Sequence, residues 1–215
     1  MTIPRTGVLL DLDGTLVDSV FHHVLAWDDA FREHGLTVAL WRVHTAIGMG
    51  SDRLVRWVLG QAAPQVGSRV DRIAKTHKER FLDRAGGLRP TNGARDLLAD
   101  LEDRGVPYLI VTSASGPETE ALLAALGRDD LPLANSDATE DTKPAAAPIL
   151  QACAEIELEP RWATLVGDSP WDAEAAVLAG TRAAGVRCGG FSESALTAAG
   201  VTIVVDDPRH LIGRL

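Results

Sequence analysis

The sequence predicts an α/β protein with a mainly parallel sheet and an inserted helical domain, and two observations lead to that prediction. The first is the recurrence of short apolar runs separated by helical patterns, which is typical of strand–helix units in a parallel sheet. The five runs lie at Val8–Leu12, Pro107–Thr112, Ala163–Val166, Arg182–Val186 and Thr202–Val205. The second is that the strand signal disappears between Asp18 and Gly87, where helical patterns follow one another.

The region from Asp18 to Gly87 carries apolar residues at helical spacing in three places. In each place they recur every three or four positions, as on the buried face of an amphipathic helix. The three stripes are Val20, Val24, Trp27 and Phe31; then Leu54, Val55 and Val58; then Val70, Ile73, His77 and Phe81. We therefore predict an inserted α-helical domain at residues 17–87.

The rest of the chain alternates strand-like runs with helical patterns that end in a glycine. Glycine is common just after a helix because it adopts the left-handed backbone conformation that closes the last turn. These patterns are Leu97, Leu98 and Leu101 before Gly105; Leu122, Leu123 and Leu126 before Gly127; and Ala173–Leu178 before Gly180. Residues 1–16 and 88–215 therefore form the predicted α/β core, which the insert interrupts.

Composition restricts the partners and the compartment. The formal net charge of -9 argues against binding to nucleic acid or to an anionic membrane surface, since both need a basic face. The chain has no apolar run of about 18 residues, and residues 1–7 lack the apolar core of a signal peptide. Cys153 and Cys188 have neither zinc-ligand spacing nor a disulfide framework. We therefore expect a cytoplasmic protein.

Two aspartates lie one residue apart where the first apolar run ends. The sequence there is Asp11-Leu12-Asp13-Gly14-Thr15-Leu16. Strand alternation would turn Leu12 away and bring Asp11 and Asp13 near one another, just where Gly14 lets the backbone turn. Two close negative charges are unfavourable unless a cation or a shared reaction compensates them. A solvated Asp-Gly turn is the purely structural alternative.

Three further polar clusters fall where the sheet prediction places loops, the edge at which open α/β sheets bind ligands. They are Thr112-Ser113, Lys143 in Thr142-Lys143-Pro144, and Gly167-Asp168-Ser169-Pro170-Trp171-Asp172. Hydroxyl and backbone N–H groups hold phosphoryl oxygens, lysine neutralises carboxylate or phosphate, and aspartate ligates hard cations. Taken singly, each cluster also has a structural explanation: a helix cap, a solvated lysine or an N-cap aspartate.

Together and in this order, the four clusters resemble the motifs of the haloacid dehalogenase superfamily of phosphohydrolases. The helical insert after the first motif resembles the small cap domain of the branch that contains β-phosphoglucomutase and phosphoglycolate phosphatase. The resemblance covers nearly the whole chain. It implies a Rossmann-like three-layer core with a mainly parallel sheet, plus an inserted α-helical cap domain.

The resemblance also implies a reaction and roles for the motif residues. Asp11 would attack phosphorus and form an aspartyl-phosphate, which divides a difficult hydrolysis into two easier displacements. Asp13 would act as the general acid and then as the general base. Thr112, Ser113 and Lys143 would hold the phosphoryl group, with Lys143 also taking part in catalysis.

A Mg²⁺ ion is part of the same implied mechanism. Its ligands would be the Asp11 carboxylate, the Asp13 backbone carbonyl and Asp168, while Asp172 would bond to metal-bound water or to Lys143. The dehalogenases of the superfamily lack a carboxylate two residues after the nucleophile and need no metal. The presence of Asp13 therefore argues against carbon–halogen cleavage.

Three residues of the predicted cap are candidates for binding the substrate. His23, followed by Ala26-Trp27, resembles a histidine and alanine–tryptophan pattern of this branch. Arg53 follows a glycine-rich loop and can bind an anionic or hydroxylated group. His77 falls where β-phosphoglucomutase carries a phosphate-binding lysine, which favours a plain phosphatase. The structural alternatives are surface positions for His23 and Arg53 and a packed core position for His77.

We therefore expect a Mg²⁺-dependent phosphomonoester hydrolase that acts on a small phosphorylated metabolite, such as a sugar phosphate. A β-phosphoglucomutase-like sugar phosphate mutase, using the same Asp11 and Asp13, is the first alternative. A noncatalytic phosphate-ligand binding protein is the second, although such a protein needs no general acid. We expect a monomer or a homodimer, with no nucleic-acid or membrane partner.

Overall fold

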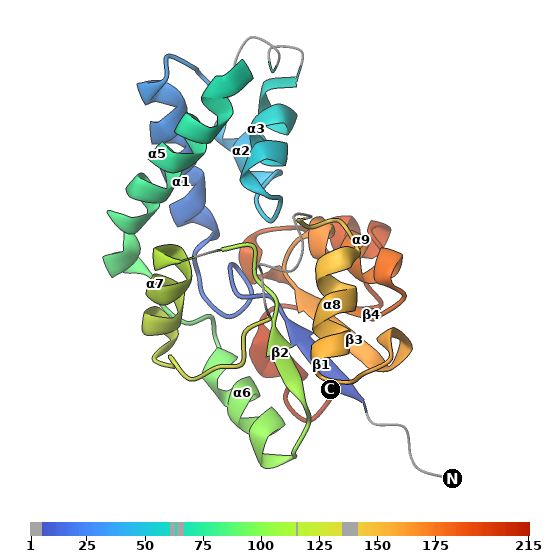
Figure 1. Ribbon diagram of the computed structural model, residues 1–215. Coiled ribbons are helices and arrows are strands. Elements are labelled where there is room, and N and C mark those ends of the chain that lie inside the picture. The colour runs from blue at the N-terminus through green and yellow to red at the C-terminus, as the bar shows by residue number, and fades with distance from the viewer. Residues whose placement is uncertain (1–5, 61–62, 64–66, 115, 135–141) are drawn as a thin grey trace.

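The structure is a computed structural model that describes residues 6–60, 63, 67–114, 116–134 and 142–215 (Figure 1). The predicted core and insert also include residues 1–5, 61–62, 64–66, 115 and 135–141, which lie outside the described residues.

A five-stranded sheet forms the centre of the core, and all its described strands run parallel. Their spatial order is β2-β1-β3-β4-β5, so β1 lies between β2 and β3. The strands are β1 (Gly7–Leu10), β2 (Tyr108–Ile110), β3 (Ala163–Gly167), β4 (Arg182–Val186) and β5 (Ile203–Val205). Each overlaps one of the five apolar runs, which confirms the predicted α/β fold.

Helices cover both faces of the sheet, because alternate strand residues point to opposite sides. Leu10 packs into one hydrophobic cluster and Leu9 into another. The covering helices are α6 (Ala94–Asp103) and α7 (Pro117–Leu126) in the Leu10 cluster, and α8 (Ala147–Glu155), α9 (Pro170–Ala179) and α10 (Glu193–Ala198) in the Leu9 cluster. The core is therefore three-layered, as predicted.

The insert folds as helices around a hydrophobic cluster of its own, in which Phe31 and Ile73 are fully buried. Its helices are α1 (Val20–Glu33), α2 (Leu40–His44), α3 (Ser51–Leu59) and α5 (Val70–Leu82). Helix α1 packs along α5. Figure 1 shows this group at the top of the view, above the core, so the predicted helical cap is present.

Short 3₁₀ turns join several of these elements. They are η2 (Gly67–Arg69), η3 (Ala85–Gly87), η5 (Pro160–Trp162), η6 (Arg187–Gly189) and η7 (Pro208–Leu211). In the part of the chain that the structure describes, no helix combines the length and the apolar composition needed to cross a membrane.

Removing a core leucine should destabilise the protein far more than removing a surface leucine. Leu97 in α6 is 0% exposed, whereas Leu178 in α9 is 66% exposed. Leu97→Ala leaves a cavity between helix and sheet, so we expect the free energy of unfolding to fall by about 2–5 kcal/mol. Leu178→Ala should change it by less than about 1 kcal/mol. Denaturant titration of both variants checks this, and equal losses would contradict the packing described.

Candidate active site

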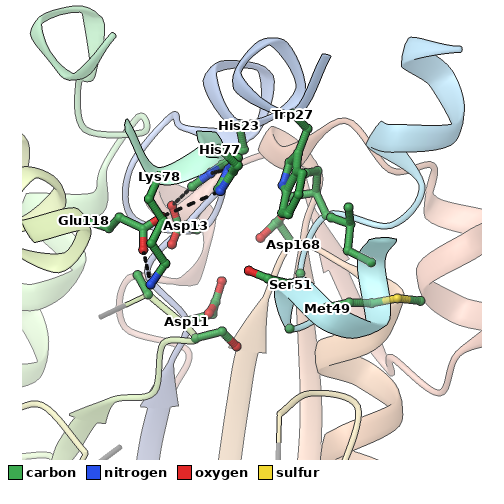
Figure 2. A pocket seen from close by; sticks show the side chains of 16 residues that line it. Asp11, Asp13, His23, Trp27, Met49, Ser51, His77, Lys78, Glu118 and Asp168 are labelled. Atoms are coloured by element: carbon green, nitrogen blue, oxygen red, sulfur yellow. Dashed lines mark hydrogen bonds and ion pairs between the residues drawn. The ribbon is translucent and has the colours of Figure 1, made fainter. Parts of the chain in front are cut away.

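The sequence-predicted motifs meet at the carboxyl ends of the central strands. Asp11 follows β1 directly, Asp168 follows β3, and Lys143 precedes α8. Asp11, Asp13 and Asp168 line one pocket between the core and the insert. Figure 2 shows Asp11 at the bottom of this pocket and His23 and His77 at its top. The parallel sheet thus brings together residues that lie far apart in the sequence.

Lys143 is the buried cation of the site, with only 2% of its surface exposed. Its Nζ atom lies 2.5 Å from Asp11 Oδ1 and 2.8 Å from Asp172 Oδ1, and it donates to the Val111 carbonyl oxygen at 2.9 Å. Burial alone would lower the pKa of Lys143, but the two carboxylates raise it above its ordinary value. The side chain therefore stays charged and ties Asp11 to Asp172.

Asp172 is held by the first turn of α9. Ser169 is the N-cap residue, and its hydroxyl and backbone N–H both bond to the Asp172 carboxylate, at 2.5 Å and 3.2 Å. A Cβ atom at Gly167 would lie 2.4 Å from Asp172 Cβ, so only glycine fits there. This capping box fixes the carboxylate that orients Lys143.

The floor of the pocket carries more negative than positive charge. Asp11, Asp168 and Asp172 place oxygen atoms within 4.8 Å of one another. Thr15 Oγ1 donates to Asp168 Oδ1 at 3.1 Å. Burial raises the pKa of Asp11 to about 7 against the pull of Lys143, and burial together with the neighbouring carboxylates raises that of Asp168 well above its ordinary value. Such a set of oxygen ligands suits a divalent hard cation.

Asp13 has a different environment from Asp11. Its Oδ1 atom accepts from the Ser19 hydroxyl at 2.7 Å and lies 2.8 Å from His23 Nε2. Burial would raise the pKa of Asp13, but the His23 ring and the Ser19 hydroxyl bring it below its ordinary value. Gly14 follows Asp13 with φ of 73°, and this left-handed conformation turns the chain between Asp13 and Ser19. The two aspartates therefore have pKa values shifted in opposite directions.

His23 and His77 connect the cap to the Asp13 carboxylate. His23 Nδ1 lies 3.0 Å from His77 Nε2, and both side chains are buried. The His23 ring stacks on Phe81 with centroids 3.9 Å apart, and the His77 ring stacks on Trp27 at 4.0 Å. Both histidines line the pocket, so His23 is not a surface residue, and His77 is both packed and accessible from the cavity.

The other predicted site residues lie in different places. Ser113 is exposed and lines the pocket. Thr112 Oγ1 accepts from Ala114 N–H at 3.0 Å within the loop, and it lines a different pocket. The next helix, α7, has Gly116 as its N-cap residue and no side-chain cap, so the helix-cap alternative for Thr112 is wrong. Arg53 is exposed and lies in a neighbouring groove with Trp57 and Trp171. The cap candidates are therefore divided between two hollows.

Sequence reasoning missed Glu118 as a site residue. It is the second residue of α7, only 5% exposed, and it lines the pocket beside Lys78 of α5. An acidic residue in the first turn of a helix ordinarily signals a favourable interaction with the helix dipole. Nothing in the local sequence distinguishes an acidic residue that interacts with the helix dipole from one that lines a pocket.

The fold and the site define a class of protein. The chain matches the family model of the haloacid dehalogenase-like hydrolases over residues 6–180. It therefore belongs to this hydrolase family, and the resemblance of the four motifs is confirmed.

Particular relatives are similar over nearly the whole chain. An N-acetylmuramic acid 6-phosphate phosphatase from Pseudomonas aeruginosa is 29% identical, over 96% of this chain and 92% of its own length. A plasmid phosphoglycolate phosphatase from Cupriavidus necator is 33% identical, over 96% of this chain and 91% of its own length.

Solved structures show the same fold. A hydrolase from Pseudomonas syringae is 26% identical and superposes with a TM-score of 0.91, over 98% of this chain and 97% of that one. A β-phosphoglucomutase from Clostridium difficile, 17% identical, has a TM-score of 0.82 over 96% of this chain and 93% of that one. At that identity the likeness concerns the fold alone.

Metal-free protein should lose stability as the pH rises from about 5 to about 7.5. Because folding raises the pKa of Asp11 from 3.8 to about 7, the folded protein binds more protons than the unfolded chain between these values. The stability that this proton provides is complete below 3.8 and is lost as the pH rises through about 7. Excess Mg²⁺ should raise Tm more at the higher pH, since it binds the ionised carboxylates.

Thermal unfolding in EDTA and in Mg²⁺ measures this effect. Asp168→Asn should remove most of the Mg²⁺-dependent rise in Tm. Asp96→Asn, at an exposed position of α6, is the matched control and should keep it. A rise of the same size in both variants would contradict the assignment of Asp168 to a cation site.

Proposed function

We propose that this protein is a Mg²⁺-dependent phosphomonoester hydrolase that acts on a small phosphorylated metabolite through an aspartyl-phosphate intermediate. The observation that carries the proposal is that Asp11 and Asp13 line one pocket in different surroundings: Asp11 pairs with the buried Lys143, and Asp13 is bonded by His23 and Ser19. Two carboxylates in different environments suit two roles, nucleophile and general acid–base. The hydrolase family and the two phosphatase relatives support this reading.

In the proposed first step, a carboxylate oxygen of Asp11 attacks phosphorus. The bond from phosphorus to the leaving-group oxygen breaks, and its electron pair goes to that oxygen. Asp13 in its protonated form donates that proton to the leaving oxygen and becomes ionised. Lys143 favours the ionised form of Asp11 and orients it, and its positive charge offsets the negative charge of the phosphoryl group.

In the second step, water attacks the phosphorus atom of the aspartyl-phosphate. Asp13, now ionised, takes a proton from that water, while the bond between phosphorus and the Asp11 oxygen breaks. Phosphate leaves and Asp11 regains its carboxylate. His23 and Ser19 favour the ionised form of Asp13 that this step requires.

The residues present fit a Mg²⁺ ion, because three buried carboxylates face the ammonium of Lys143. The Asp11 and Asp168 carboxylates and the Asp13 backbone carbonyl would be its ligands. When bound, Mg²⁺ would screen the anionic nucleophile from the anionic phosphate. Asp172 would act by positioning Lys143.

The proposed substrate is a small phosphorylated metabolite such as a sugar phosphate. The names of the relatives support this class, since both specify phosphomonoesters of small metabolites. A cytoplasmic location and a monomeric or homodimeric state are part of the same proposal.

Asp11→Asn should abolish phosphate release, because a neutral amide cannot act as the nucleophile. We expect kcat to fall by about a thousandfold or more on every substrate. The assay measures phosphate released from a panel of phosphorylated metabolites with and without Mg²⁺, and Asp96→Asn serves as the control. Turnover retained in a folded Asp11→Asn preparation would overturn the nucleophile assignment.

The same assay separates hydrolase from mutase. Given a hexose 1-phosphate, a hydrolase releases inorganic phosphate, whereas a mutase forms the 6-phosphate. We expect phosphate as the product. Accumulation of the 6-phosphate without phosphate release would replace the proposed function with the mutase.

A further inference from the structure

Glu118 and His77 meet where the core and the cap close over the pocket. Glu118 comes from α7 of the core, and His77 and Lys78 come from α5 of the cap. Lys78 Nζ lies 3.2 Å from Glu118 Oε2, and His77 Nδ1 lies 4.0 Å from Glu118 Oε1. Figure 2 shows Glu118 and Lys78 on one side of the pocket and Trp27 and Met49 on the other.

The hydrogen bonds of the histidine pair make His77 Nδ1 an acceptor. When the His23 ring is neutral, its Nε2 donates to the Asp13 carboxylate and its Nδ1 accepts from His77 Nε2. The proton of a neutral His77 ring is thus on Nε2. Burial, with the nearby Lys78 ammonium, lowers the pKa of His77 well below its ordinary value, which keeps the ring neutral.

Two buried acceptors therefore face one another across 4.0 Å. His77 is 4% exposed, and its Nδ1 atom has no hydrogen-bond partner among the residues that the structure describes. A buried polar atom without a partner is unfavourable, and two acceptors cannot satisfy each other. A donor at about 2.8–3.0 Å from each atom would satisfy both.

Trp27 and Met49 lie across the pocket from Glu118, with Ser51 near Met49 (Figure 2). Ile47 and Leu54 also line the pocket, and all four apolar residues belong to the hydrophobic cluster of the cap. A group bound between the two walls therefore meets hydrophobic surface on one side and hydrogen-bond acceptors on the other. The carbon skeleton of a polyol or sugar, with hydroxyl groups along one edge, has this character.

We propose that Glu118 and His77 Nδ1 form an acceptor pair that binds a hydroxyl or N–H group on the leaving group of the substrate. This inference rests on the proposed phosphatase function and names its substrate class: phosphomonoesters that carry a hydrogen-bond donor at the end remote from the phosphate. A carboxylate there is disfavoured because it brings no donor to Glu118 Oε1 or His77 Nδ1, and the Lys78 ammonium is already paired with Glu118 Oε2. Phosphoglycolate is therefore a poor substrate, although relatives of this chain are named for it.

Three small esters test this inference because they differ only at the remote end. They are 2-hydroxyethyl phosphate, ethyl phosphate and phosphoglycolate, which carry a hydroxymethyl, a methyl and a carboxylate group. We expect kcat/KM for the hydroxyethyl ester to exceed that for each of the others by about tenfold or more. Glycerol 3-phosphate and 3-phosphoglycerate form a second pair that differs in the same way.

Glu118→Gln should reduce the preference for hydroxymethyl over carboxylate by about tenfold, because the amide is neutral and can donate to a carboxylate. Each ratio is measured within one preparation, so a general loss of folding or chemistry does not change it. Glu120→Gln, at an exposed position of the same helix, is the matched control and should leave every ratio unchanged.

The outcomes distinguish the inference from the function it rests on. Mg²⁺-dependent release from all three esters at equal efficiency, or an unchanged ratio in Glu118→Gln, would overturn the acceptor pair while leaving the phosphatase in place. No release from any ester of either set would count against the phosphatase itself. A preference for phosphoglycolate over the hydroxyethyl ester would also overturn the inference.

Discussion

The site depends on how the protein compensates carboxylates buried at the carboxyl ends of parallel strands. Asp11, Asp168 and Asp172 lie close together, and the Lys143 ammonium joins two of them. Buried charges are tolerated only when they are paired and hydrogen-bonded, and breaking a buried pair costs about 3–5 kcal/mol. The Ser169 capping box and Gly167 both keep the Asp172 carboxylate against Lys143. Ser169 bonds to that carboxylate, and Gly167 leaves room for it because it has no side chain. The negative charge that remains is what a divalent cation would neutralise.

The cap contacts the proposed acid–base residue as well as covering the pocket. Asp13 belongs to the core, yet its carboxylate pairs with His23 of α1, and His23 in turn bonds to His77 of α5. Glu118 of α7 and Lys78 of α5 join core to cap a second time. Docking of the cap therefore sets the environment of the proposed general acid and, at the same place, the chemistry that the leaving group meets. In the proposed function, turnover and substrate choice would depend on one set of contacts between cap and core.

Much of this could be predicted from the sequence, because the signals involved are local. The five strands are apolar runs, and Asp11, Asp13, Lys143 and Asp168 lie in short motifs whose order is informative. The remainder depends on how the cap sits on the core. Arg53 lines a separate groove. Glu118 lines the pocket from the first turn of α7, where an acidic residue is common whether or not it has a functional role. His77 keeps the apolar helical register and still lines the cavity, which periodicity alone cannot reveal.

The most direct test of the central claim is to trap the phosphorylated residue. Enzyme quenched during turnover of a phosphomonoester in Mg²⁺ would be treated with borohydride, which reduces an acyl phosphate to the corresponding alcohol, and then mapped by peptide mass spectrometry. The account predicts that Asp11 is converted to homoserine, and that the conversion requires both substrate and Mg²⁺. Reduction at another carboxylate, or steady turnover with Asp11 unmodified throughout, would contradict it.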